Sequence, residues 1–260
     1  MITKISQFII LPMLLLASCA PTTPDTAPSN LTLEEYPIDN YSIEPLQLMP
    51  SGGLTEEQVF GRREQEWKHS LPTNEYYGLG YGDLWTVFDD GKLEKHRILL
   101  DENSLLGMVS ITRDGEPFFN TPEFTLPPAM AETRVLTTYD NHWVLEIAKY
   151  DKAASVETVD LFVVGEIFVD GQSLNQLFGY DDAFGFQTIH GRPFYFFRRS
   201  GKVNISYDGH EIQTSYDLVR HYLCCSAGEL NPKIAQNIVG FFAWRNDKQY
   251  YVEAGYFGED

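Results

Sequence analysis

The sequence predicts a mostly β, antiparallel domain rich in hairpins and meanders, with one or two short helices. The first observation is the alternation of apolar and polar residues along many short segments between Leu84 and Ala254. The second is a series of tight-turn pairs beside these segments, such as Asp170-Gly171 and Asp208-Gly209, which supply the positive φ angles of two-residue hairpin turns. Of the 260 residues, 43% are hydrophobic, which suffices for a substantial core.

The first eighteen residues have the features of a signal peptide. A single cation, Lys4, precedes the apolar run Phe8–Leu16, which has the length of a signal-peptide core and is shorter than the roughly 20 residues that span a bilayer. Leu16-Ala17-Ser18-Cys19 resembles the lipobox of bacterial lipoproteins, in which an aliphatic residue and two small residues precede the cysteine. The resemblance implies that residues 1–18 are removed and that Cys19 becomes the acylated N-terminus.

This resemblance also implies a location. Two or more acyl chains give stable anchoring, so the chain is expected on the extracytoplasmic face of the cell membrane or of an outer membrane. In a two-membrane envelope, Asp after the cysteine commonly signals inner-membrane retention, and Ala20 in that place favours the outer membrane. The formal net charge of -18 argues against nucleic acid as a partner and against a protein lying flat on anionic lipid.

Residues 19–52 are expected to form an acylated, flexible tether. The stretch from Ala20 to Pro50 is rich in proline, contains no Lys or Arg, and shows no helical or strand period. This composition is typical of an extended spacer, and about 30 residues could reach roughly 100 Å. Residues 53–260 are then expected to form a single antiparallel β-rich globular domain.

Within that domain, Thr55 is a suitable N-cap for a helix that ends before Pro72. Ser173–Phe178 and Asn231–Asn237 are candidates for short helices. The expected strands are Leu84–Phe88, Gly107–Thr112, Arg134–Tyr139, Trp143–Lys149, Leu161–Val169, Phe184–Ile189, Phe194–Arg198, Val203–Tyr207, Ile238–Trp244 and Gln249–Ala254. Expected turns include Asp90-Gly91, Asp114-Gly115, Asp140-Asn141, His190-Gly191, Ser200-Gly201 and Asn246-Asp247.

The segment Phe184–Ile212 is predicted to be a four-stranded meander, because three turn pairs fall within it at ten- and eight-residue spacing. Phe194-Tyr195-Phe196-Phe197 is apolar on both faces, which predicts a central strand covered on both sides. A four-stranded meander resembles one blade of a β-propeller. Because the earlier turns are spaced irregularly, both propeller-like and sandwich-like arrangements remain open.

Cys224 and Cys225 are adjacent, and His221 precedes them by three positions. Three interpretations are open. The cysteines could be buried thiols, they could form a strained vicinal disulfide, or they could join His221 in binding a soft metal such as copper or zinc if the segment is helical.

Aromatic residues gather near the start of the domain at Tyr76, Tyr77, Tyr81 and Trp85. Such side chains stack on sugar rings and anchor protein partners, and in a β fold they also fill core and edge positions. Both interpretations are open for this group.

The acidic pairs Asp89-Asp90 and Asp181-Asp182 could perform acid–base chemistry or bind calcium, but their positions favour a role in turns. The sequence has no G-x-S-x-G nucleophile elbow and no H-E-x-x-H motif,, and it does not identify a cofactor. The leading hypothesis is therefore a membrane-anchored, non-catalytic module that binds a protein, glycan or peptide. The alternatives are an envelope hydrolase that uses paired carboxylates and a protein with a Cys-Cys redox or metal site.

Overall fold

Antiparallel strands dominate the computed structural model, which describes residues 31–38, 85–127, 133–151, 163–222, 233–234 and 238–255. The strands form four sheets, here named I to IV, and the predicted fold class is confirmed. Sheet I contains β2 (Trp85–Phe88), β3 (Gly91–Asp101), β4 (Leu106–Arg113), β5 (Glu116–Asn120) and β6 (Phe124–Thr125). Sheet II contains β7 (Thr133–Tyr139), β8 (His142–Tyr150), β9 (Val163–Val169) and β10 (Gln172–Ser173). Sheet III contains β11 (Asp182–Ile189), β12 (Arg192–Arg199), β13 (Lys202–Tyr207) and β14 (His210–Tyr216). Sheet IV contains β1 (Thr32–Ile38), β15 (Leu218–Val219), β16 (Lys233–Ile234), β17 (Ile238–Arg245) and β18 (Lys248–Gly255).

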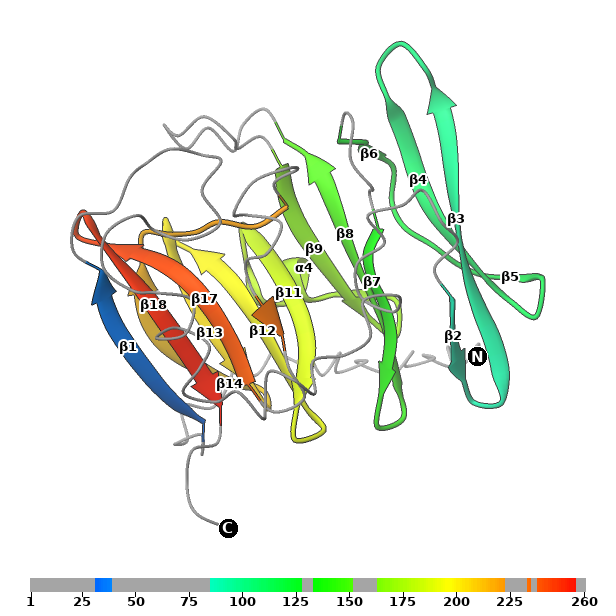
Figure 1. Ribbon diagram of the computed structural model, residues 1–260. Coiled ribbons are helices and arrows are strands. Elements are labelled where there is room, and N and C mark those ends of the chain that lie inside the picture. Colours follow the sequence, from blue (N-terminus) through cyan, green and yellow to red (C-terminus); the bar gives the residue numbers. More distant parts are fainter. Residues whose placement is uncertain are drawn as a thin grey trace, which may run out of the picture.

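The sheets lie side by side in the order I, II, III, IV (Figure 1). A hydrophobic cluster fills each of the three interfaces, so that sheets II and III are covered on both faces. Sheets I and IV lie at opposite ends of the row, and none of the described sheets closes into a barrel. The arrangement is therefore sandwich-like, with four layers.

Sheets I, II and III each run as a meander of four consecutive strands. Their second connections differ in length, because β3 ends at Asp101 and β4 begins at Leu106, whereas β8 ends at Tyr150 and β9 begins at Val163. In sheet III the same connection is the two-residue turn Ser200-Gly201. These unequal connections explain why the turn spacing in the sequence is irregular although the sheets repeat one plan.

The aspartates of the hairpin turns extend the strand ladders. Asp114 and Asp170 have φ angles of 51° and 49°. The Asp114 N–H donates to the carbonyl of Lys92 and its carboxylate accepts the Lys92 N–H at 2.8 Å, and Asp170 does the same with Trp143. The carboxylate thus takes the place of a strand carbonyl, which glycine, having no side chain, could not do. The turn predicted at Asp90-Gly91 lies one residue earlier in the structure. Asp89 and Asp90 have the positive φ angles, and Gly91 already begins β3.

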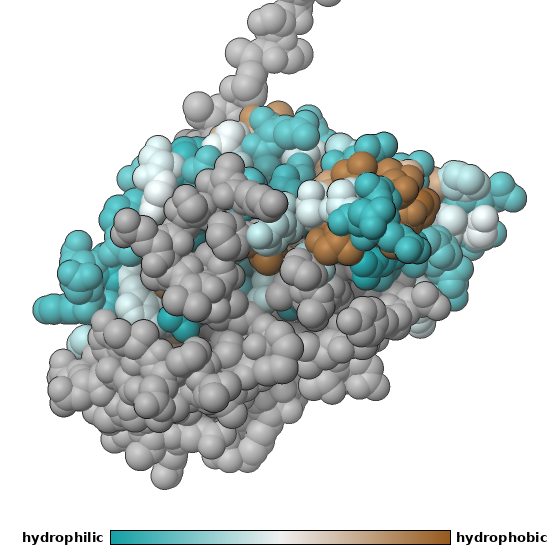
Figure 2. All heavy atoms as spheres, turned by 90° about the horizontal axis from the view of Figure 1, so that it is seen from above, coloured by the Kyte–Doolittle hydropathy of each residue, from teal (hydrophilic) through white to brown (hydrophobic). Residues whose placement is uncertain are grey.

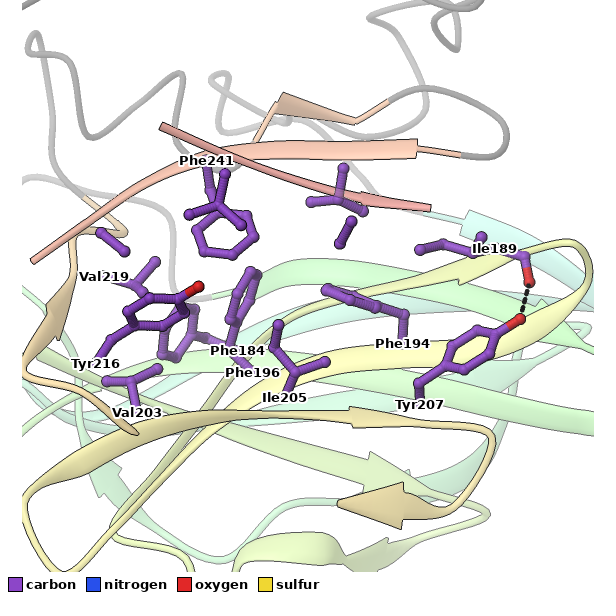
Figure 3. Close-up of a cluster of buried hydrophobic side chains, with 14 of the residues drawn as sticks. Phe184, Ile189, Phe194, Phe196, Val203, Ile205, Tyr207, Tyr216, Val219 and Phe241 are labelled. Carbon is purple, nitrogen blue, oxygen red and sulfur yellow. Dashed lines mark hydrogen bonds between the residues drawn. The ribbon is translucent and has the colours of Figure 1, made fainter. Parts of the chain in front are cut away.

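The predicted meander from Phe184 is confirmed as sheet III, and β12 is one of its two central strands. Phe194 and Phe196 face the core shared with sheet IV, while Tyr195 and Phe197 face the core shared with sheet II. Figure 3 shows the first of these cores, where Phe184, Phe194 and Phe196 point toward Phe241 of β17. The two phenylalanine rings of β12 and β17 meet edge to face, with centroids of Phe196 and Phe241 at 4.8 Å.

Helix α4 (Leu174–Phe178) confirms one of the expected short helices, with Ser173 as its N-cap. The other expectation, at Asn231–Asn237, is wrong at its centre, because Lys233–Ile234 pairs with β17 as strand β16. The helix expected after Thr55 lies outside the described residues. Among the residues that are described, no helix is long and apolar enough to cross a membrane.

Strand β1 corrects the expected extent of the tether. Thr32–Ile38 falls inside the segment expected to be a flexible spacer, yet it pairs with β18 through seven register positions. Glu35 of this strand accepts hydrogen bonds from Arg245 Nη1 at 3.0 Å and Nη2 at 2.5 Å, and from the hydroxyl of Tyr216 at 2.5 Å. Burial alone would raise the pKa of Glu35, but these bonds hold it below its ordinary value.

Sheets II and III approach each other closely at Gly165. A Cβ at this position would lie 2.2 Å from the carbonyl oxygen of Ala183 and 2.5 Å from the hydroxyl of Tyr222. Contacts this short cannot exist without displacement of the β11 backbone. Gly165 therefore sets the distance between the two central sheets.

Replacement Gly165→Ala is expected to lower the free energy of unfolding by about 3 kcal/mol, because overpacking displaces a well-packed backbone. The control is Gly115→Ala, whose added Cβ meets nothing within 4 Å and whose positive φ costs about 1 kcal/mol. Urea unfolding followed by circular dichroism measures both. Equal losses for the two variants would contradict the close approach.

Candidate functional sites

Glu146 of β8 lies wholly buried between sheets II and III. Its Oε2 accepts the Phe186 N–H at 2.7 Å, and its Oε1 accepts the Gly185 N–H at 3.1 Å and the Tyr222 hydroxyl. These donors exist because the β11–β12 register shifts between Phe184 and Gln187, and a bulge removes amides from the ladder. Burial raises the pKa of Glu146 in spite of these bonds. The carboxylate is a structural acceptor for the bulge.

Asp182, the first residue of β11, is a second buried carboxylate in this interface. Its Oδ1 accepts the Gly165 N–H at 2.7 Å, and its Oδ2 lies 3.3 Å from His221 Nε2 and 3.9 Å from Arg198 Nη2. Burial would raise the pKa of Asp182, but the charge of His221, helped by Arg198 and Gly165, holds it below its ordinary value. Asp182 therefore remains charged inside the protein.

His221, a candidate metal ligand in the sequence, is held between these groups. Its ring stacks on Phe184 with centroids 3.4 Å apart, and its Nδ1 lies 2.9 Å from the carbonyl oxygen of Val219. Nε2 faces the Asp182 carboxylate at 3.3 Å but forms no hydrogen bond of acceptable geometry there.

Cys224 and Cys225, the other members of that candidate site, lie outside the described residues, as does the lipidation candidate Cys19. Within the described ranges, no three His, Cys, Asp or Glu side chains form a group that could hold a metal ion.

Tyr222 anchors the segment that follows β15. It adopts a left-handed backbone conformation with a φ of 58°, which is unfavourable for an aromatic residue. The Arg134 guanidinium lies 4.9 Å from its ring centroid, and its hydroxyl binds Glu146. The strained backbone is thus compensated by contacts to sheet II.

The acidic pairs of the sequence have separate outcomes. Asp89-Asp90 forms the β2–β3 turn, as favoured. Asp181-Asp182 corrects the turn interpretation, because Asp182 is buried at the start of β11 while Asp181 is exposed. The alternation of a strand places the two side chains on opposite sides, so this pair does not converge on one substrate.

An open pocket of about 580 Å³ lies beside the β9–β10 turn. It is lined by Asp170, Gly171, Gln172, Ser173, Gln176 and Leu177. The only carboxylate in this lining already accepts the Trp143 N–H and lies 2.5 Å from His142 Nδ1. Glycoside hydrolysis by paired carboxylates needs a second acid across the cleft, which this lining does not supply.

Large exposed hydrophobic side chains of the described chain all belong to sheet I. They are Trp85 at 58% exposure, Val87 at 55%, Leu100 at 44%, Leu99 at 41% and Phe118 at 36%. Viewed from above, hydrophobic residues gather on the right-hand part of the molecule, where sheet I lies in Figure 1 (Figure 2). Sheet I is thus the surface of the described chain most suited to a partner.

Trp85 is the one described member of the aromatic group singled out in the sequence, and it is exposed. The Lys92 ammonium lies 5.3 Å from its ring centroid, and Glu94 pairs with Lys92. Tyr76, Tyr77 and Tyr81 lie outside the described residues. Leu99 and Leu100 are exposed members of β3 that do not follow from the sequence pattern, although two adjacent leucines before Asp101 leave one of them on each face of a strand,.

Comparisons with protein-family models, with curated proteins and with solved structures find no match to this chain.

Replacement Asp182→Asn is expected to cost about 3–5 kcal/mol of stability at neutral pH, because it removes the buried carboxylate that faces Arg198 and His221,. Since the folded pKa of Asp182 lies below its ordinary 3.8, the loss is present in full above that pH and shrinks as the pH falls through the folded pKa. Urea unfolding at several pH values measures it. The neighbouring exposed Asp181→Asn is the control and should change stability by under about 0.5 kcal/mol; equal effects would refute the buried ion pair.

Proposed function

We propose that this chain is a lipoprotein, held on the extracytoplasmic face of a membrane by acyl chains on Cys19, whose β domain is a non-catalytic binding module. The lipobox-like Leu16-Ala17-Ser18-Cys19 supports the anchor. The observation that carries the binding function is that, among the residues that the structure describes, the large exposed hydrophobic side chains all belong to sheet I. Exposed hydrophobics scattered singly are ordinary, whereas their concentration in one sheet is typical of interaction sites.

The use made of the buried acids favours binding over catalysis. Glu146 and Asp182 accept hydrogen bonds from backbone N–H groups, and each is tied to a second polar side chain. Reaction chemistry needs a carboxylate that can reach a substrate. These two are enclosed between sheets, and their contacts account for their positions.

Strand β1 limits how far the proposed anchor lets the domain move. Leu31, which packs into the core shared by sheets III and IV, follows Cys19 by twelve positions. Twelve residues reach at most roughly 40 Å when fully extended. The module would therefore work close to the membrane surface.

Mass spectrometry of the mature chain tests the anchor. We expect an N-terminal Cys19 that carries two or three acyl chains, and Cys19→Ser should release the protein from the membrane fraction because no lipid is attached. The control is Cys225→Ser, which should leave the chain in the membrane fraction. An intact Met1, or an unmodified thiol at residue 19, would contradict the proposal.

A photo-crosslinking amino acid at Val87 tests the binding surface in cells that lipidate the chain. We expect a discrete cross-linked product from Val87, because it is exposed on sheet I. The control position is Ser200, an exposed turn residue of sheet III, which should give no such product. The same products from both positions would argue against sheet I as the binding surface.

A further inference from the structure

The pocket beside the β9–β10 turn presents two carboxamide side chains that the protein itself does not use. Gln172 of β10 and Gln176 of α4 line this pocket, and both residues are exposed. The Gln176 backbone N–H donates to Ser173 Oγ at 3.2 Å, but among the described residues neither carboxamide has a hydrogen-bond partner. Each carboxamide therefore offers two donor hydrogens and one acceptor oxygen to a ligand.

The other polar groups of the lining are already engaged. Asp170 Oδ1 accepts the Trp143 N–H at 3.1 Å, and its Oδ2 lies 2.5 Å from His142 Nδ1. Ser173 Oγ donates to Glu166 Oε1 at 2.5 Å. Asp170 is also the only ionisable side chain in the lining, and the whole chain has a net charge of -18. An anionic ligand is therefore disfavoured, and the groups that remain free are neutral amides.

Aromatic side chains of sheet I border the same pocket. Gly171 of the lining has a φ of 80°, and a Cβ there would lie 3.2 Å from the Phe119 ring and 3.7 Å from the Trp143 ring. The Phe118 ring packs edge to face on Trp143 with centroids 5.5 Å apart, and it is one of the large hydrophobic side chains left exposed. An exposed aromatic ring thus lies near two free carboxamides, a combination suited to the apolar faces and the hydroxyl groups of a sugar.

The size and shape of the pocket favour a sugar unit over a peptide. Its volume of about 580 Å³ is within the range of roughly 300–1,000 Å³ that small-molecule pockets usually have. Peptides bind chiefly along strand edges or in grooves that hold a helix or a polyproline segment, whereas this pocket is made by the β9–β10 hairpin and a helix of five residues. Sugar hydroxyl groups both donate and accept hydrogen bonds, as the two carboxamides do.

We propose that this pocket binds one sugar unit of a neutral glycan, whose hydroxyl groups pair with the carboxamides of Gln172 and Gln176 and whose apolar ring face contacts Phe118. The inference rests on the proposed binding function and names the class of its ligand. It also gives one of the exposed hydrophobic side chains of sheet I a specific role. Because the pocket is open, the remaining units of the glycan can extend beyond it.

A glycan array tests this inference with the full chain, purified in detergent and clustered through a C-terminal tag on a fluorescent antibody. Clustering raises the avidity of weak single sites, and it does not depend on acylation of the chain. We expect binding to neutral oligosaccharides and none to oligosaccharides of uronic acids, whose carboxylates would meet the acidic surface. Absence of binding to every neutral glycan, or binding to acidic glycans alone, would overturn the inference.

Variants of the lining locate the site. The double change Gln172→Ala with Gln176→Ala should weaken binding to the neutral glycans about tenfold or more, because it removes both free carboxamides. Phe118→Ala should weaken it roughly fivefold, because it removes the aromatic contact. The matched control is Gln213→Ala, which changes another exposed glutamine, on β14 of sheet III, and should leave binding unchanged. Circular dichroism checks that each variant is folded, and equal binding by the double variant and the unchanged chain would rule out this pocket.

Other results separate this inference from the proposed function. A protein cross-linked at Val87, with no glycan bound, would overturn the glycan inference and leave the binding module standing. Absence of both would overturn both. A cross-linked protein that the double glutamine variant no longer captures would assign the pocket to that protein, and so overturn the glycan as its ligand.

Discussion

The arrangement of the whole stack depends on how sheets II and III are joined through buried carboxylates. Glu146 and Asp182 come from opposite sides of this interface, and each accepts a backbone N–H from the other sheet. A buried charge is costly unless it is paired and fully hydrogen bonded. Because the donors are backbone groups at fixed positions, the two carboxylates specify one register between the sheets, which hydrophobic packing alone leaves adjustable.

The same interface fixes the position of His221 and Tyr222, which follow β15 of sheet IV. The Tyr222 hydroxyl donates to Glu146, and His221 lies beside Asp182. Sheets II, III and IV are thereby connected through polar side chains as well as through their hydrophobic cores. Sheet I shares only a hydrophobic core with sheet II among the described clusters, which suits an end layer that presents a surface to a partner.

The parts of the fold that could be read from the sequence are those set by local chemistry. The Asp-Gly turns and the run Phe194–Phe197, which is apolar on both faces, can be predicted from neighbouring residues alone. Strand β3 was missed because Lys92, Glu94 and Lys95 obscure its alternation, although Leu93 is fully buried. Strand β1 was missed because its partner lies more than two hundred positions away, with Thr32 opposite Gly255. The roles of Glu146 and Asp182 were likewise hidden, since a bulge in β11 and a close approach at Gly165 are properties of two sheets together.

Strand β1 also has a mechanical consequence. It begins beside Gly255 and runs antiparallel to β18, so tension applied through the lipid that we propose at Cys19 would load the strand from its Thr32 end. Such a load shears all seven residue pairs at once instead of opening them in succession from one end. Glu35, the central residue of β1, also forms an ion pair across β18 with Arg245 of β17, which adds a second connection to sheet IV. If the domain is tethered through β1, this strand would stay paired with β18 when a force on sheet I pulls the domain away from the membrane.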